Sequence, residues 1–314
     1  MVRSHSSAMM AALGAASIWG GMYVVSKYVL AFLPPLTLVG LRLAIAAVVL
    51  SGLAAGSRAG LAPRSGLPRL LLCGVVGFGI SLTAQFAGTR LSTAHDGALI
   101  TSATPAFIAL FAGWLLKERV TPWRWLAMAV ATAGVIVVAT DQLPDPAAAL
   151  PSAGAPPATV PRDAGEAPLG NALLFVAAVT WALYTVLAKA SMERDSPLIV
   201  TTYATYGGLL CVLPAVPLEW AALAPPDWGA LPALAWWGML YLGVVSTAVA
   251  FYLWNRAFET LDASLASLFF FAQPVVGSLL GWLLLDEHLS PRFFAGAAAI
   301  VAGVLLSSSA PTRT

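Results

Sequence analysis

AMMAALGAASIWGGMYVVSKYVL occupies residues 8–30, and GNALLFVAAVTWALYTVLAKA occupies residues 170–190. Each stretch is long enough to cross a hydrocarbon core of about 30 Å as a helix. A single constant shift along the chain aligns Trp19 with Trp181 and Lys27 with Lys189. The same shift aligns Pro35 with Pro197 further along the chain. These two stretches therefore predict a membrane protein whose second half repeats the first.

Composition supports the membrane class. Hydrophobic residues make up 59% of the 314 residues and charged residues only 10%, too little polar surface for a soluble protein of this size. The net charge of +2 comes from basic residues scattered between apolar runs, which argues against a nucleic-acid partner. Cys73 and Cys211 lie in separate apolar runs, where we interpret them as small hydrophobic residues rather than a disulfide.

Ten segments are apolar and long enough to be membrane spans. Their approximate bounds are 8–30, 35–55, 68–89, 94–116, 122–140, 170–190, 197–219, 231–255, 263–285 and 291–309. The pairs Thr121-Pro122, Ser196-Pro197 and Ser290-Pro291 are typical helix starts, because a hydroxyl caps the helix and proline tolerates its first turn. No run alternates as a strand does, so we expect an all-helical protein. We interpret the first run as a span rather than a signal peptide because it is long and lacks a clear cleavage site.

The segments divide into two sets of five. We expect a first five-helix repeat at 8–140, a Pro/Ala-rich linker at 141–169 and a second repeat at 170–309. Later spans align at a slightly larger shift, which pairs Pro105 with Pro274, Glu118 with Glu287 and Gly134 with Gly303. Five is an odd number, so the second repeat enters the membrane from the opposite side. Inverted repeats of this kind are typical of secondary transporters.

Lysine and arginine predict the orientation, because they are retained in cytoplasmic loops. With the N-terminus inside, the cytoplasmic set is Arg3, Arg58, Arg64, Arg69, Lys117, Arg119, Arg124, Lys189, Arg194, Arg256 and Arg313. The outer set is only Lys27, Arg90, Arg162 and Arg292. Both termini are therefore expected in the cytoplasm, with the acidic linker outside.

These motifs resemble the EamA family of the drug/metabolite transporter superfamily. The resemblance rests on Trp19 to Lys27, Pro35 with Arg42, Pro105, Leu115-Leu116-Lys117-Glu118-Arg119-Val120-Thr121 and Gly134-Val135, and on the echo Leu284-Leu285-Asp286-Glu287-His288-Leu289-Ser290 with Gly303-Val304. It covers nearly the whole chain. It implies a ten-helix carrier of the bacterial inner membrane, often an exporter of amino acids or other small metabolites. The long linker departs from the usual short connection.

Polar residues inside spans are candidate binding residues, because they are costly in lipid and usually face the bundle interior. Arg42 could bind a substrate carboxylate, or it could be a structural cation held by backbone carbonyls or Asp96. Its aligned partner is Ala204, so this charge occurs in one half only. Gly77, Ser81 and Gln85 form a polar stripe on the third span, and Gly243, Thr247 and Asn255 form one on the eighth. The stripes predict a wet cavity or, alternatively, hydrogen bonds between closely packed helices.

Two prolines inside apolar runs, Pro105 and Pro274, are candidate gating kinks or static kinks, and Gln273 precedes the second. Aromatic residues could stack against cargo or anchor helix ends, and we include Trp19, Tyr23 and Tyr184 as binding candidates. His95-Asp96 is the one His–carboxylate pair near a span, which suggests proton coupling or a simple helix-dipole interaction. Glu118 and Glu287 are expected to organise loops at the membrane surface.

The sequence carries no nucleotide-binding loop, metal-ligand cluster or catalytic motif, so we expect no cofactor, no metal and no enzymatic activity. The predicted partners are a small-molecule substrate and the lipid bilayer, with the chain acting as a monomer or homodimer. An alternative is a non-transporting receptor or a membrane enzyme that has kept the fold. The sequence leaves the cargo, the direction of transport and the coupling ion open.

Overall fold

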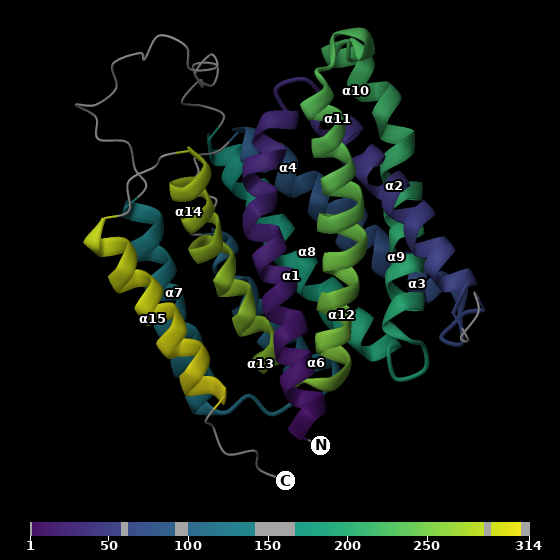
Figure 1. The fold of residues 1–314 in the computed structure, drawn as a ribbon. Helices are drawn as coiled ribbons and strands as arrows, with labels where there is room; N and C mark the ends of the chain where they lie inside the picture. Colours follow the sequence, from purple (N-terminus) through teal and green to yellow (C-terminus); the bar gives the residue numbers. More distant parts are fainter. Residues whose placement is uncertain (1, 58–61, 92–99, 142–166, 286–289, 309–314) are drawn as a thin grey trace.

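A computed structural model describes residues 2–57, 62–91, 100–141, 167–285 and 290–308 (Figure 1). The regular structure of these residues is entirely helical, as predicted. Most of the predicted linker, residues 142–166, lies outside the described residues. Among the described residues, six helices are long and apolar enough to cross a membrane: 35–55, 67–91, 168–191, 197–223, 233–260 and 263–280.

Every predicted span corresponds to helical structure. The first half contains α1 (Val2–Val29), α2 (Pro35–Ala55), α3 (Leu67–Gly74), η1 (Val75–Ser81), α4 (Leu82–Leu91), α6 (Thr104–Leu115) and α7 (Pro122–Asp141). The second half contains α8 (Ala167–Ser191), α9 (Pro197–Val212), η2 (Leu213–Ala215), α10 (Val216–Leu223), η3 (Trp228–Ala230), α11 (Ala233–Leu240), η4 (Tyr241–Val249), α12 (Ala250–Thr260), α13 (Ala263–Ala266), η5 (Ser267–Phe271), α14 (Ala272–Leu285) and α15 (Pro291–Ser308).

Proline marks the helix starts as the sequence predicts. Helices α7, α9 and α15 each begin at a proline that follows a hydroxyl residue. Ser196 accepts a hydrogen bond from the Ile199 amide at 3.4 Å, and Ser290 accepts one from the Arg292 amide at 3.0 Å. Each hydroxyl thus satisfies an amide that has no partner in the first turn.

Several spans are interrupted near their middle. The third span contains the π-helix η1 and the eighth contains the π-helix η4. Their first residues, Val75 and Tyr241, occupy equivalent places in the two halves, so both repeats carry the same irregularity. The ninth span contains a 3₁₀ segment, η5, just before α14. π-Turns are rare and are frequent at functional sites, which directs attention to this depth of the bundle.

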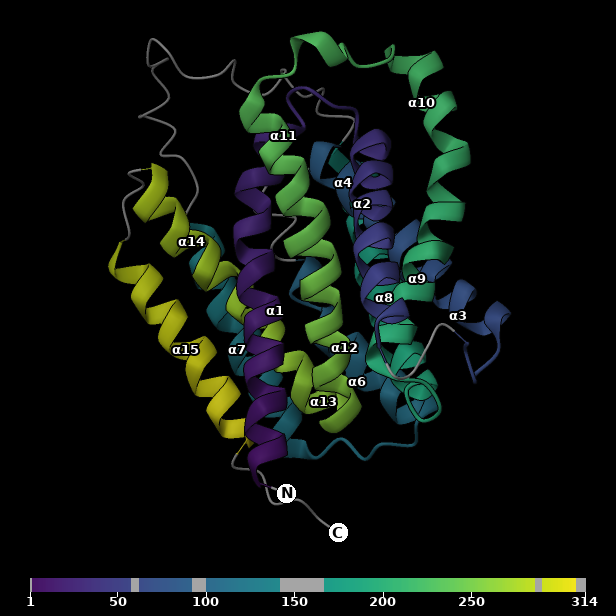
Figure 2. The same cartoon turned by 45° about the vertical axis from the view of Figure 1, so that its right-hand side comes forward.

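The two halves pack as an inverted pair rather than side by side. In the first half, α1 lies against α12 and α14 of the second; in the second half, α8 lies against α4 and α6 of the first. Likewise α2 packs on η4, and α9 packs on η1. Each contact is therefore made twice, once by each repeat, and Figure 2 shows α1 between α14 on one side and α12 on the other.

Close glycine contacts repeat in the same way where α7 meets α15. A Cβ on Gly134 would lie 2.6 Å from the Gly296 carbonyl oxygen, and one on Gly303 would lie 2.7 Å from the Ala127 carbonyl oxygen. The shift that aligns Gly134 with Gly303 also aligns Ala127 with Gly296, so the repeat converts the first contact into the second. The tertiary structure therefore confirms the inverted repeat that the sequence predicts.

The first residues of α1 and the last residues of α15 lie at the same end of the bundle, at the bottom of Figure 1. We call this end the N-terminal face. The loop that joins α10 to α11 lies at the other end, which we call the opposite face (Figure 2).

Candidate functional site

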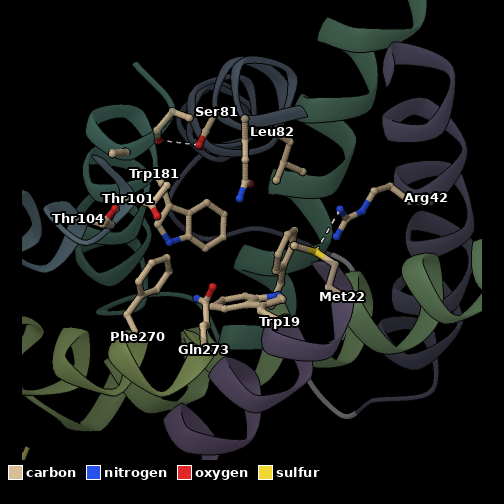
Figure 3. Close-up of a pocket in the computed structure, with 14 residues that line it drawn as sticks. Trp19, Met22, Arg42, Ser81, Leu82, Thr101, Thr104, Trp181, Phe270 and Gln273 are labelled. Carbon is tan, nitrogen blue, oxygen red and sulfur yellow. Dashed lines mark hydrogen bonds between the residues drawn. The ribbon is translucent and has the colours of Figure 1, made fainter. Parts of the chain in front are cut away.

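A small cavity lies between the halves, near the middle of the spans (Figure 3). Its volume is about 40 Å³, which is room for about three water molecules. The first half contributes Trp19, Met22, Arg42, Ser81, Leu82, Gln85, Thr101 and Thr104. The second half contributes Ala177, Ala178, Trp181, Phe251, Phe270 and Gln273.

Two equivalent tryptophans meet at the cavity. Trp19 lies ten residues before the end of α1, and Trp181 lies ten residues before the end of α8, about 15 Å along each helix. Their ring centroids are 5.4 Å apart, and the rings are nearly perpendicular at 85°. Because the repeat exchanges these two residues, their contact places the cavity on the pseudo-twofold axis between the halves.

Arg42 is the one charged residue among the described residues that line the cavity. Its side chain is buried, with 1% of the residue exposed. The guanidinium donates to Thr247 Oγ1 at 2.9 Å, to Ser246 Oγ at 3.3 Å and to the Met22 sulfur at 3.5 Å. It also lies 5.5 Å from the centroid of the Phe86 ring. All of these partners are neutral, and the described part of the chain gives Arg42 no ion pair.

The π-helix η4 supplies the groups that hold Arg42 and Trp19. Thr247 accepts from Arg42 and donates to the Leu242 carbonyl, five residues earlier, at 2.6 Å. The Ser246 carbonyl accepts a hydrogen bond from the Trp19 indole at 3.0 Å. In η1, Ser81 instead donates to the Ala177 carbonyl at 2.8 Å, which ties the third span to the sixth. The π-turns thus orient the cavity walls.

The two walls of the cavity differ in chemistry. The shift that aligns Pro105 with Pro274 also aligns Thr101 with Phe270. The shift that aligns η1 with η4 also aligns Gln85 with Phe251. Both pairs line the cavity, with the polar member in the first half and the aromatic member in the second. Arg42 likewise has an alanine as its equivalent in the second half. The cavity therefore has a polar, cationic wall and a largely aromatic wall.

The structure brings together five of the predicted binding residues. Trp19, Arg42, Ser81, Gln85 and Gln273 all line the cavity. Trp181, Thr101, Thr104, Phe251 and Phe270 also line it, although they were not among the predicted residues. The alignment of Trp181 with Trp19 was a signal that could have identified the first of these. The alignment of Thr104 with the predicted Gln273 was a similar signal, whereas no local pattern indicates that Thr101, Phe251 and Phe270 face the cavity.

Three predicted residues lie behind the cavity wall. Thr247, Tyr184 and Asn255 are fully buried and do not line the cavity. Asn255 donates to Tyr184 Oη at 2.8 Å and to Thr201 Oγ1 at 2.9 Å. The second polar stripe therefore forms hydrogen bonds between helices, and only the first stripe reaches the cavity.

The remaining predicted residues divide into two groups. Pro105 is the second residue of α6 and Pro274 the third of α14, so both lie in a first helical turn that follows an interruption. They therefore do not kink the middle of a helix. In a first helical turn the backbone nitrogen has no hydrogen-bond acceptor within the helix, so proline removes no helical hydrogen bond there. His95, Asp96 and Glu287 lie outside the described residues, as does the side chain of Tyr23.

Charged residues join the two halves at the N-terminal face. The Lys189 ammonium at the end of α8 lies 3.4 Å from Glu118 Oε1 and donates to the carbonyls of Phe258 and Leu261. Glu118 Oε2 accepts from the Ala263 amide at 2.8 Å, at the start of α13. Glu118 thus contacts the second half at two points, which exceeds the loop-organising role that we expected from the sequence.

A second ion pair strengthens this closure. Arg124 in the first turn of α7 lies 2.6 Å from Asp262 Oδ2 and donates to Ser264 Oγ at 2.7 Å. Both partners flank the start of α13. We call Glu118, Arg124, Lys189 and Asp262 the N-terminal latch, since together they join α6, α7 and α8 to the connection between α12 and α13.

Comparison with known proteins gives the family. The profile of the EamA-like transporter family matches residues 6–140 and again residues 168–309. The chain belongs to the EamA-like transporter family. The two matches fall on the two halves that the structure relates by inversion. The protein is therefore a multi-pass membrane transporter.

Relatives of this EamA-like transporter include proteins with named cargo. The chain is 28% identical to a "Probable biotin transporter" of Pseudomonas aeruginosa, over 75% of each chain. It is also 28% identical to a "Probable terminal-alkyne amino-acid exporter" of Streptantibioticus cattleyicolor, over 84% of this chain and 81% of that one. A solved crystal structure at 22% identity matches 97% of both chains with a TM-score of 0.76, which shows the fold alone.

Proposed function

We propose that this EamA-like transporter is a secondary carrier that exports small metabolites, such as amino acids or drug-like compounds. It would work by alternating access between its inverted halves, without enzymatic activity. The observation that carries the proposal is the cavity on the pseudo-twofold axis, lined by both halves and centred on Trp19 and Trp181. A site at the repeat interface, near mid-membrane, is where such carriers bind their substrate.

The volume of the cavity supports a moving mechanism. Space for about three water molecules is too small for an amino acid, so cargo requires the walls to separate. We propose that the first half (8–140) and the second half (170–309) rock against each other about the tryptophan pair. We propose that the chain bends just before α6, which contains Pro105, and at the 3₁₀ segment before Pro274, because regular α-helix is already interrupted at both places.

The N-terminal latch supports a conformation closed at one face. It joins both halves through ion pairs in which Arg124, Lys189 and Glu118 are largely buried and Asp262 is exposed, and it must break for cargo to pass that way. We propose that this face is cytoplasmic, in a bacterial inner membrane, and that cargo leaves through the opposite face. The two named relatives are described as a probable transporter of biotin and a probable exporter of a terminal-alkyne amino acid; both compounds contain a carboxylate, which the buried Arg42 could bind.

Counterflow in proteoliposomes tests the proposal. Purified full-length protein is reconstituted, preloaded with unlabelled compound, and offered labelled amino acids, biotin, aromatic acids and cationic drugs in turn. We expect accumulation of at least one compound above protein-free liposomes, and a loss of about 10-fold or more for Trp19→Ala, which removes one half of the central pair. Leu53→Ala, at an exposed position on α2, is the matched control. If no compound accumulates, the carrier function is wrong.

A further inference from the structure

We infer that α2 and α9 form the hinge of the transport cycle and stay in contact while the two halves rock. This inference rests on the proposed carrier function and names the part of the molecule that does not open. Helix α2 belongs to the first half and α9 to the second, and they lie side by side (Figures 1 and 2). A buried carboxylate fastens this pair of helices at each of its two ends.

At the opposite face, Glu219 in α10 caps the first turn of α2. The residue is only 9% exposed. Its Oε1 accepts from the Leu36 amide at 2.7 Å, and its Oε2 accepts from the Thr37 amide and hydroxyl, each at 2.8 Å. First-turn amides have no partner in their own helix, and a carboxylate is favourable at the positive end of the helix dipole. The segment that leaves α9 thus holds the segment that enters α2.

At the N-terminal face, Asp195 makes the corresponding contact in the other direction. It lies just before α9, is 6% exposed, and accepts from the amides of Arg64 and Ser65, both at 2.7 Å. These two residues lie between α2 and α3. The segment that leaves α2 thus holds the segment that enters α9. We call the contacts of Glu219 and Asp195 the end clamps, and both are closed in the same conformation.

Symmetry indicates which contacts can last through the cycle. In a carrier with inverted repeats that rock against each other, access changes sides when the repeats exchange their conformations. A contact between equivalent helices, such as α2 with α9, is then converted into itself. The N-terminal latch joins elements that are not equivalent, so the exchange converts it into a contact between other elements.

The latch must therefore break in each cycle, whereas nothing requires the α2–α9 contact to change. Opening an end clamp would also leave a buried carboxylate without the amides that it accepts from, which is costly. The Trp19–Trp181 contact likewise joins equivalent residues. The hinge and the tryptophan pair therefore lie on the same pseudo-twofold axis, and the halves open away from it.

Two cysteine pairs, each joined by a short cleavable thiol cross-linker on a cysteine-free background, test the hinge. Gly40→Cys with Val212→Cys joins α2 to α9, because a Cβ on Gly40 would lie 3.8 Å from a Val212 methyl carbon. Glu118→Cys with Lys189→Cys joins the latch instead. Counterflow is measured with a compound that wild-type protein accumulates. We expect the hinge cross-link to retain at least about half of the rate before cross-linking, and the latch cross-link to lower it about 10-fold or more, reversibly.

Distances between spin labels test the hinge without any cargo. One labelled pair is Val48 with Leu210, which are exposed on α2 and α9; the other is Arg119 with Glu193, which are exposed on the two sides of the latch. In the Lys189→Met variant, the pair across the latch should gain a population at longer distance. The pair across the hinge should keep its wild-type distribution.

The outcomes separate the hinge from the carrier function. Loss of counterflow on cross-linking α2 to α9 would overturn the hinge while transport stands, and so would full counterflow with the latch cross-linked. A hinge pair whose distance lengthens together with that of the latch pair would overturn it as well. If wild-type protein moves no compound of the panel, the carrier function fails, and the spin-label distances alone decide whether α2 and α9 stay together.

Discussion

At the scale of single residues, the bundle depends on positions where no side chain fits. A Cβ on Gly74 would lie 1.9 Å from the Ala204 carbonyl oxygen, and one on Gly207 would lie 2.0 Å from that of Leu71. These glycines let α3 and α9 approach until backbone touches backbone. Small residues at such crossings replace the hydrophobic driving force that helices lack inside lipid.

We therefore expect Gly74→Ala to destabilise the fold by about 1–3 kcal/mol, because an added methyl group must push α3 from α9. The measurement is the thermal midpoint of the detergent-solubilised protein, followed by loss of the monodisperse peak. Gly52→Ala is the control, since a Cβ on Gly52 has no neighbour within 4 Å. Equal midpoints for the two variants would contradict the close crossing.

For Arg42, the sequence predicts a buried cation but does not predict its hydrogen-bond partners. Its position in an apolar run indicates a functional or structural cation, and both hypotheses survive the sequence alone. Its hydrogen bonds to Thr247 and Ser246 come from η4, in the other half of the chain. Thr247 was predicted to bind substrate directly, but it lies behind the cavity and positions Arg42 instead.

At the scale of elements, the N-terminal latch is the feature that a transport cycle must break. Lys189 joins the end of α8 to Glu118 and to two carbonyls at the end of α12. Its side chain is mostly buried, with 19% exposed, so the interaction is screened less than a surface ion pair. Removing it should favour conformations that are open at this face.

We expect Lys189→Met to increase access to the cavity from the N-terminal face. A single cysteine at Ala178, on a background without Cys73 and Cys211, is labelled by a membrane-impermeant thiol reagent in inside-out vesicles. The labelling rate should rise about 5- to 30-fold, as a loss of about 1–2 kcal/mol from the closed state predicts.

Arg256→Met is the matched control for this element. It breaks the Arg256–Glu259 ion pair, which lies within α12 alone and is partly exposed. Labelling should stay at the starting rate, because this pair does not join the two halves. An equal increase in both variants would mean that the latch has no specific part in closure.

At the scale of the whole molecule, the inversion of the two repeats determines which loops lie on the same side of the membrane. Ser57 follows α2 at the N-terminal face, and Asp227 lies between α10 and α11 at the opposite face. We expect Ser57→Cys to be labelled only in inside-out vesicles and Asp227→Cys only in intact cells. Labelling of both from the same side would contradict the inverted arrangement, and the reverse pattern would place the termini outside.

The sequence by itself determined the spans, the halves and their inversion. Backbone amides cannot remain unpaired in lipid, so about twenty consecutive apolar residues must form a helix wherever they occur, and an odd number of spans per repeat forces inversion. Proline and hydroxyl pairs then marked helix starts such as Pro122, Pro197 and Pro291.

Only the tertiary structure decided which side chains meet. A π-turn adds one residue to the helix and so rotates the next turn by about 100°. Ser81 and Gln85, in and after η1, line the cavity, whereas Thr247 and Asn255, in and after η4, lie behind it. No local pattern encodes that rotation, because it is set by contacts between halves, such as the hydrogen bond from Ser81 to the sixth span and the one from the Trp19 indole to η4.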